Sequence, residues 1–195
     1  MTTQTSATIL IVPGLRDHVA EHWQTLLEAK LSRTRQVVSV PPLEQDKLSC
    51  AARVNAIERT LAGIQGPVII VAHSGGVIML AHWAQQHQHA IQGALLAAPP
   101  DFETPLPAGY PTLETLQTNG WLPVPSAPLP FPSIVAASTN DPLASYARVE
   151  QLAQQWGSTL VNVGAVGHLN PASGYGEWPR AEDFIRQIDA KFALP

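Results

Sequence analysis

The sequence has only one cysteine, Cys50, among its 195 residues, and only 13% of its side chains are charged. A single cysteine excludes an internal disulfide, which suits a protein of a reducing compartment. The net charge of −4 leaves no excess of basic residues, so we expect no nucleic acid partner. No apolar run approaches the roughly 20 residues that a helix needs to cross a membrane.

A signal peptide is also not expected, because Met1 to Ser6 contain neither its basic region nor its apolar region. These absences together predict a cytoplasmic protein without a membrane partner. Apolar residues are abundant by contrast, at 45% of the sequence, which is enough for a sizeable core. The length fits one domain, and we expect that domain to span residues 1–195.

Short apolar runs alternate along the chain with segments of helical periodicity. The predicted strands comprise residues 8–12, 37–40, 68–72, 91–97, 133–137 and 159–163. The predicted helices comprise residues 21–31, 48–62, 75–86, 112–118, 142–156 and 180–192. This alternation predicts an α/β fold with about six mostly parallel strands and helices on both faces of the sheet.

The most informative stretch is the predicted strand 68–72 with the turn that follows it. Ser74 stands at the apex of this turn, between the strand and a predicted helix. Ala72 and Gly76 flank the serine with small side chains, which a tight turn with a strained backbone requires. The pattern is typical of a nucleophile elbow, and an ordinary strand-to-helix turn capped by a serine is the alternative.

Polar side chains and turns follow several predicted strands directly. Pro13-Gly14, Ser74, Asp101, Asp141 and His168 each come just after one of them. The carboxyl ends of parallel strands lie on the same edge of a sheet, where ligand sites form. We therefore expect these residues to gather there although they are distant in sequence.

A serine nucleophile requires a base, and the base requires an acid that orients it. His168 is the one histidine that follows the predicted strand 159–163. Hydrolases of this architecture use the chain order serine, acid, histidine. Asp141 and Asp101 both fit as the acid, and we prefer Asp141 because its loop precedes the histidine loop directly. Asp141 also has a structural alternative as the N-cap of a helix with Pro142 at its first position.

Two backbone N–H groups are candidates for an oxyanion hole. One belongs to Gly75, directly after the serine, and the other to Leu15, in the loop after the first predicted strand. Such a pair of donors stabilises the tetrahedral intermediate of acyl transfer.

Residues 99–132 contain 10 of the 18 prolines of the chain. A long segment with so little periodicity is usually either disordered or functional. Its aromatic residues predict a lid-like insertion over the site, in which Phe102, Tyr110 and Trp121 line an apolar acyl pocket. A long surface connection, with the aromatic side chains in a satellite core, is the alternative.

The remaining histidines and the cysteine have structural interpretations. We expect His73 to point away from the serine side chain and Cys50 to pack near a helix start. His82, His87 and His89 lie on or after one predicted helix, without a clustered cysteine or carboxylate. We therefore expect no metal ion and no organic cofactor.

Several segments together resemble a known family, the small α/β-hydrolases related to retinoblastoma-binding protein nine and YdeN. The resemblance extends over nearly the whole chain. It rests on Pro13-Gly14 with His22-Trp23, Ala72-His73-Ser74-Gly75-Gly76, Asn140-Asp141-Pro142, Gly167-His168-Leu169-Asn170 and Ser173-Gly174-Tyr175-Gly176-Glu177-Trp178-Pro179.

The resemblance implies a compact α/β-hydrolase in which Ser74, Asp141 and His168 form a catalytic triad. It also implies serine hydrolase activity, and we expect cleavage of a small ester through an acyl-enzyme. Hydrolysis of an amide or peptide is the enzymatic alternative, and a binding protein that retains only the fold is the other. The family usually has glycine in this elbow at the position of Ala72. His22-Trp23 matches a feature of the family to which we assign no role.

Overall fold

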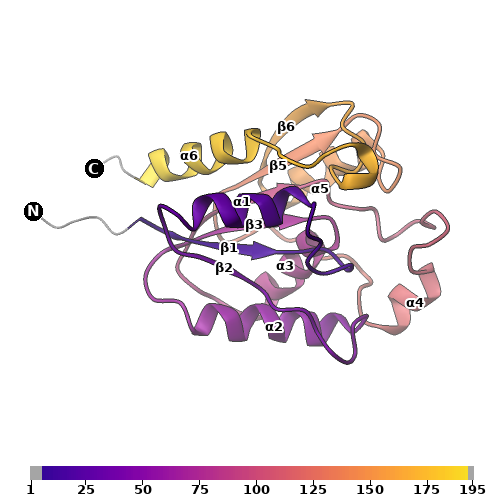
Figure 1. The fold of residues 1–195 in the computed structure, drawn as a ribbon. Coiled ribbons are helices and arrows are strands. Elements are labelled where there is room, and N and C mark those ends of the chain that lie inside the picture. Colours follow the sequence, from indigo (N-terminus) through magenta and orange to yellow (C-terminus); the bar gives the residue numbers. More distant parts are fainter. Residues whose placement is uncertain (1–5, 193–195) are drawn as a thin grey trace, which may run out of the picture.

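The computed structural model describes residues 6–192, and a twisted sheet lies at its centre with helices on both sides (Figure 1). Its strands are β1 Thr8–Val12, β2 Val37–Ser39, β3 Val68–His73, β4 Ile91–Ala97, β5 Ser133–Ser138 and β6 Thr159–Gly164. Neighbouring strands pair in parallel in the order β2-β1-β3-β4-β5-β6. The predicted α/β class with six parallel strands is confirmed.

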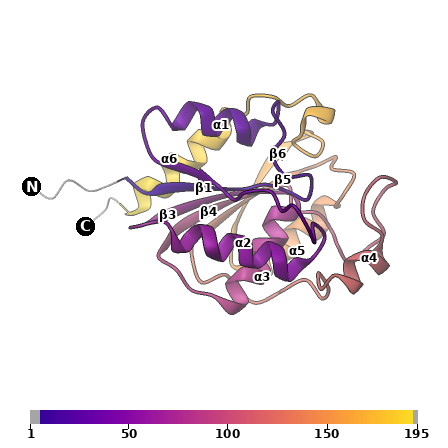
Figure 2. The same cartoon turned by 60° about the horizontal axis from the view of Figure 1, so that its bottom comes forward.

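The helices cover both faces of this sheet (Figure 2). On one face lie α1 Trp23–Leu31 and α6 Arg180–Phe192, and on the other lie α2 Cys50–Ala62, α3 Gly75–Gln86 and α5 Tyr146–Trp156. Every residue of β1, β3, β4 and β5 is buried as a result. Strands buried on both faces are expected to be apolar throughout, which explains the continuous apolar runs of the sequence. No helix between residues 6 and 192 is long and apolar enough to span a membrane.

Four helices begin one to four residues later than predicted because polar side chains cap them there, and α1 and α5 are the examples that bear on the site. The helix expected from residue 21 begins at Trp23, since the His22 ring accepts a hydrogen bond from the Gln24 N–H. The helix expected from Pro142 begins at Tyr146, where Ser145 is the N-cap. The alternative role of Asp141 as the N-cap of this helix is therefore wrong.

The strand order places a switch point between β1 and β3. From β1 the chain first adds β2 on one side and then crosses back to add β3 on the other. At such a point the loops after the two strands diverge, which opens a crevice beyond their carboxyl ends. The loop that starts at Pro13 and the turn at Ser74 form the two sides of this crevice.

The proline-rich segment 99–132 contains one short helix, α4 Leu113–Thr118, close to the predicted position. In both views α4 lies beyond the edge of the sheet rather than on either face (Figures 1 and 2). The part after α4 returns to the core, where Trp121, Val124 and Phe131 are buried. The segment thus has an outer half near the strand ends and an inner half that packs against the fold.

Candidate active site

Ser74 has a backbone conformation that side chains rarely adopt, with φ 55° and ψ −130°. It connects the end of β3 to the first turn of α3, and its N–H donates to the carbonyl of Ala97 on the neighbouring strand. Strain of this kind persists only where the surrounding structure enforces it, and it is common at functional sites.

Gly76 is the residue that allows the turn to pack so tightly. A Cβ atom added to it would lie 2.5 Å from the carbonyl oxygen of Val12 and 2.7 Å from that of Pro13. Those oxygens belong to the backbone and cannot move aside. Ala72, two residues before the serine, is fully buried in β3 and is compatible with the turn.

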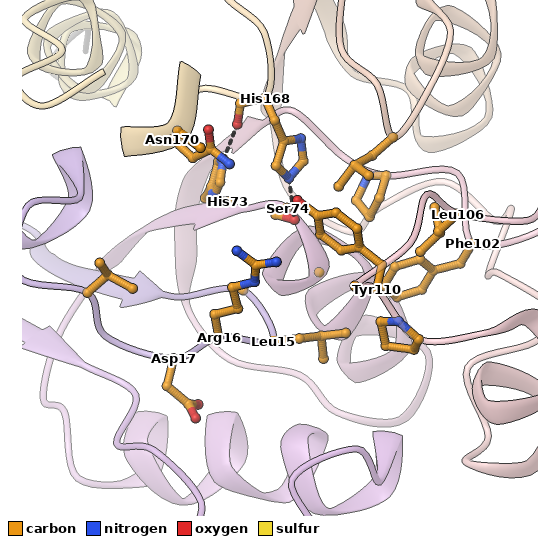
Figure 3. A pocket seen from close by; sticks show the side chains of 18 of the residues that line it. Leu15, Arg16, Asp17, His73, Ser74, Phe102, Leu106, Tyr110, His168 and Asn170 are labelled. Carbon is orange, nitrogen blue, oxygen red and sulfur yellow. Dashed lines mark hydrogen bonds between the residues drawn. The ribbon is translucent and has the colours of Figure 1, made fainter. Parts of the chain in front are cut away.

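The Ser74 side chain makes no capping hydrogen bond to α3, so the interpretation as a capping serine is wrong. Its Oγ instead lies 2.7 Å from Nε2 of His168 (Figure 3). The other ring nitrogen of His168, Nδ1, lies 2.8 Å from Oδ2 and 3.0 Å from Oδ1 of Asp141. An ionised carboxylate only accepts, so the Nδ1–H of His168 donates to Asp141, and Nε2 is the ring nitrogen that faces the serine hydroxyl.

Asp101, the other candidate acid, has different partners. Its carboxylate accepts hydrogen bonds from the Glu103 N–H, the Thr104 hydroxyl and the guanidinium of Arg148. These contacts stabilise the start of the proline-rich segment. Asp141 is thus the carboxylate that the structure brings to His168.

Three hydrogen bonds from distant elements hold the loop that carries His168. The Gly167 N–H donates to the side chain of Asn140, which precedes Asp141 in the neighbouring loop. His73 donates from Nε2 to the His168 carbonyl oxygen, and Trp23 donates from Nε1 to the Leu169 carbonyl oxygen. Trp23, which the sequence left without an assigned role, thus contributes a contact with the histidine loop.

The N–H groups proposed for the oxyanion hole lie side by side. A Cβ atom placed on Gly75 would be 3.5 Å from the Leu15 nitrogen, and one on Gly14 would be 3.6 Å from the Ser74 Oγ. Within residues 6–192 neither the Gly75 nor the Leu15 N–H has a protein acceptor. Both donors are therefore available beside the serine hydroxyl.

Two further histidines pack behind His168. The ring centroids of His22 and His73 are 4.6 Å apart, and those of His73 and His168 are 5.1 Å apart. Burial, with a smaller effect of His168, lowers the pKa of His22 to about 4 and that of His73 well below its ordinary value. Both rings are therefore neutral near pH 7. His22 Nε2 is buried without a partner among the described residues.

Cys50 has no reactive environment. Its side chain is buried, and this burial raises the pKa of its thiol to about 12. A thiol of this kind stays protonated and is a poor nucleophile.

A cavity of about 640 Å³ opens over Ser74 and His168. Phe102 and Tyr110 line it, together with other residues of the segment from Pro100 to Thr115. Trp121 does not line it, which corrects that prediction. Its side chain is fully buried below Phe102, at 5.5 Å between ring centroids, and its Nε1 donates to the Leu48 carbonyl oxygen. The chain turns back to the core directly after α4, which carries Trp121 away from the cavity.

The sequence alone indicated no role for Arg16 or for Asn140, although Asn140 belongs to the Asn140-Asp141-Pro142 motif. Arg16 lines the cavity, and Asn140 connects the two loops that carry Asp141 and His168. Arg16 follows the predicted oxyanion residue directly, and Asn140 stands beside the predicted acid. Their position next to candidate residues was the signal that could have identified them.

Comparisons with known proteins agree with this fold. A YdeN-like hydrolase from Pectobacterium atrosepticum is 31% identical, with a TM-score of 0.77 over 97% of this chain and 93% of that one. The ydeN gene product of B. subtilis is 18% identical, with a TM-score of 0.73 over 95% of this chain and 100% of that one. The mouse alpha/beta hydrolase domain-containing protein 10 is 14% identical, with a TM-score of 0.71 over 96% and 90% of the two chains.

A comparison with curated proteins found no match. The sequence profile of one protein family, described as serine hydrolase, matches residues 9–187 and thus includes every strand except the first residue of β1. The resemblance to YdeN-related hydrolases that the motifs indicate is confirmed by the solved structures. The chain therefore belongs to the serine hydrolase family.

Proposed function

We propose that this protein hydrolyses a small carboxylic ester by a Ser-His-Asp triad made of Ser74, His168 and Asp141. The contact between the Ser74 Oγ and His168 Nε2, at 2.7 Å on a strained turn, is the observation that carries the proposal. A nucleophile and a base within hydrogen-bond reach, with the base oriented by a third group, have the arrangement that activates a serine.

In the first half of the reaction Ser74 Oγ attacks the ester carbonyl carbon while its proton moves to His168 Nε2. Asp141 keeps the ring oriented through Nδ1 and stabilises the imidazolium that forms. The tetrahedral intermediate collapses when its bond to the alcohol oxygen breaks and His168 returns the proton to that oxygen. In the second half water attacks the acyl-enzyme along the same route and releases the acid.

The Gly75 and Leu15 N–H groups donate to the oxyanion of both intermediates. The two N–H groups lie beside Ser74 and have no protein acceptor within residues 6–192, which supports this assignment. Loss of one such donor typically lowers the rate by ~100- to 1000-fold.

Phe102 and Tyr110 form part of the apolar wall that receives the substrate. The segment 99–132 acts as a lid over the site. It belongs to a single domain that extends over residues 1–195, and residues 1–5 and 193–195 of this range lie outside the described part of the chain. A cavity of about 640 Å³ suits a small substrate, because pockets for drug-sized ligands range from about 300 to 1,000 Å³. Est1E from Butyrivibrio proteoclasticus, a structural neighbour at 11% identity, has been solved with ferulic acid bound.

The experiment that tests this function is labelling with a fluorophosphonate probe, followed by mass mapping of the labelled peptide. We expect labelling at Ser74 in the wild type, no labelling in Ser74→Ala and weak labelling in His168→Ala. A panel of small esters and amides then gives kcat/KM for each bond type. We expect the esters to be the better substrates.

Two other outcomes point elsewhere. Faster turnover of the amides than of matched esters would assign the protein to the amide and peptide hydrolases. A folded wild type that the probe fails to label would mean that the serine is not activated, and a binding protein with this fold would then be the better description.

A further inference from the structure

We propose that the substrate carries a carboxylate group that binds to Arg16, a residue of the cavity wall. This inference rests on the proposed function and adds to it the charge of the substrate. The loop after β1 contains Arg16 directly after Leu15, whose N–H is assigned to the oxyanion hole. In Figure 3 the Arg16 guanidinium extends from this loop into the cavity, on the side where Ser74 lies.

The charge balance of the cavity wall favours an anion. Arg16 and Asp17 are the lining residues with a formal charge, histidines aside. The Asp17 carboxylate is neutralised by Arg53, whose side chain is only 6% exposed and forms an ion pair with it. No carboxylate among residues 6–192 pairs with Arg16 in the same way. Arg16 therefore supplies an uncompensated positive charge to a largely apolar cavity.

Arg53 also fixes the loop on both sides of Arg16. It donates to the Leu15 carbonyl oxygen at 3.2 Å, and it pairs with Asp17. A further hydrogen bond of 2.8 Å, from Arg53 Nε to the Lys47 carbonyl oxygen, holds the Arg53 side chain in place. Because the two neighbours of Arg16 are held by one buried side chain, the loop presents Arg16 from a fixed backbone.

Tyr110 orients the guanidinium from the opposite wall. The Arg16 Cζ atom lies 4.9 Å from the centre of the Tyr110 ring, within the range of a cation–π contact. A cation–π contact uses the charge of the guanidinium and leaves its N–H groups available for hydrogen bonds. Those N–H groups match the two oxygens of a carboxylate, which they bind in a bidentate manner.

The test uses two ester pairs, each with one anionic and one neutral member of nearly the same size. In the first pair the acyl side varies, with para-nitrophenyl hydrogen adipate and its neutral half-amide counterpart. In the second pair the leaving group varies, with para-acetoxybenzoate and para-acetoxybenzamide. The two pairs distinguish a carboxylate on the acid from one on the alcohol. We measure kcat and KM for wild type, Arg16→Gln, Arg16→Lys and the control Arg59→Gln, which is exposed on α2 outside the cavity wall.

We expect the wild type to prefer the anionic member of at least one pair by about tenfold in kcat/KM, the size of one charge-assisted hydrogen bond. Arg16→Gln should abolish this preference mainly through KM, and Arg16→Lys should retain part of it. Arg59→Gln should retain all of it. Equal turnover of both members in both pairs by the wild type, or a preference that survives in Arg16→Gln, would overturn the inference.

A binding measurement separates this inference from the proposed function. Calorimetry with Ser74→Ala reports the affinity for each ester without turnover. Tighter binding of the anionic ester, lost in Ser74→Ala/Arg16→Gln, supports the carboxylate site even if the wild type hydrolyses no ester. Hydrolysis without any preference in rate or affinity retains the proposed function and rejects the role of Arg16.

Discussion

His73, the residue directly before the elbow serine, donates a hydrogen bond from Nε2 to the backbone carbonyl oxygen of His168 over 2.8 Å. The two side chains of one dipeptide thus contact the same distant residue, because the Ser74 Oγ meets the ring of His168 while His73 meets its backbone. The strand end that presents the proposed nucleophile therefore also positions the proposed base.

The first prediction concerns this contact. His73→Leu should lower kcat by roughly 10- to 100-fold with little change in KM, because a small displacement of a reacting group has effects of that size. His73→Gln, which keeps an N–H donor, should recover part of the loss. His87→Leu, on a residue outside the cavity wall, is the control. Equal kcat for wild type and His73→Leu would contradict the positioning role.

The second prediction separates the two acids. Asp141→Asn should lower kcat by about 10³- to 10⁴-fold, since an amide in place of the carboxylate favours the wrong tautomer of the histidine. Asp101→Asn removes a partner of Arg148 and should lower thermal stability while kcat stays close to that of the wild type. Steady-state kinetics and thermal unfolding of both variants distinguish the roles. The reverse pattern would assign the acid to Asp101.

The third prediction tests the packing of the elbow. Gly76→Ala places a methyl group 2.5 Å from the carbonyl oxygen of Val12, so the end of β1 and the start of α3 must separate. Overpacking of this kind typically costs about 1–3 kcal/mol, and activity should fall with it. Gly63→Ala is the matched control, because its methyl group would lie 3.5 Å from the nearest atom at an ordinary φ of −84°. Chemical denaturation of both variants gives the difference, and equal stability would reject the close approach.

The fourth prediction concerns acid stability. The folded-state pKa of His22 is about 4 against an ordinary 6.5, so the unfolded chain binds a proton first as the pH falls. The free energy of unfolding should therefore be unaffected by His22 above pH 6.5 and decrease between pH 6.5 and 4. Each pKa unit of difference amounts to about 1.4 kcal/mol. Buried His73, with its lowered pKa, contributes in the same direction.

His22→Asn checks the assignment of this effect. Asparagine is a good N-cap residue, so α1 should keep its start, and only the titrating ring is lost. Urea unfolding at a series of pH values should give a shallower dependence on pH in the variant than in the wild type. An unchanged slope would mean that other groups cause the acid sensitivity.

Much of the fold could be predicted because the buried strands are continuous apolar runs between proline and glycine turns. The chain order of Ser74, Asp141 and His168 also depends on the sequence alone, and the structure places their side chains in contact. Helix starts were less predictable, since more than one polar side chain can stand near a start. Ser145 rather than Asp141 begins α5, because the Asp141 carboxylate binds His168 and the Leu143 N–H.

Contacts between distant loops were outside the reach of the sequence. The role of Trp23 depends on its Nε1 meeting the Leu169 carbonyl oxygen, 146 positions away. The burial of Trp121 depends on where the chain turns after α4, which periodicity does not report in a proline-rich segment. Arg16 has no motif of its own, and its place in the cavity follows from the loop that Arg53 holds.

A large part of the cavity wall comes from a stretch of the chain that contains none of the contacting Ser-His-Asp set. The three polar side chains lie in the loops after β3, β5 and β6, whereas the wall residues from Pro100 to Thr115 all belong to one segment between β4 and β5. This segment contains no strand and none of the three polar residues, so it can be replaced by another segment without changing either. We therefore expect a transplanted segment to change which substrates fit against this part of the wall, while the Ser-His-Asp set and Arg16 stay as they are.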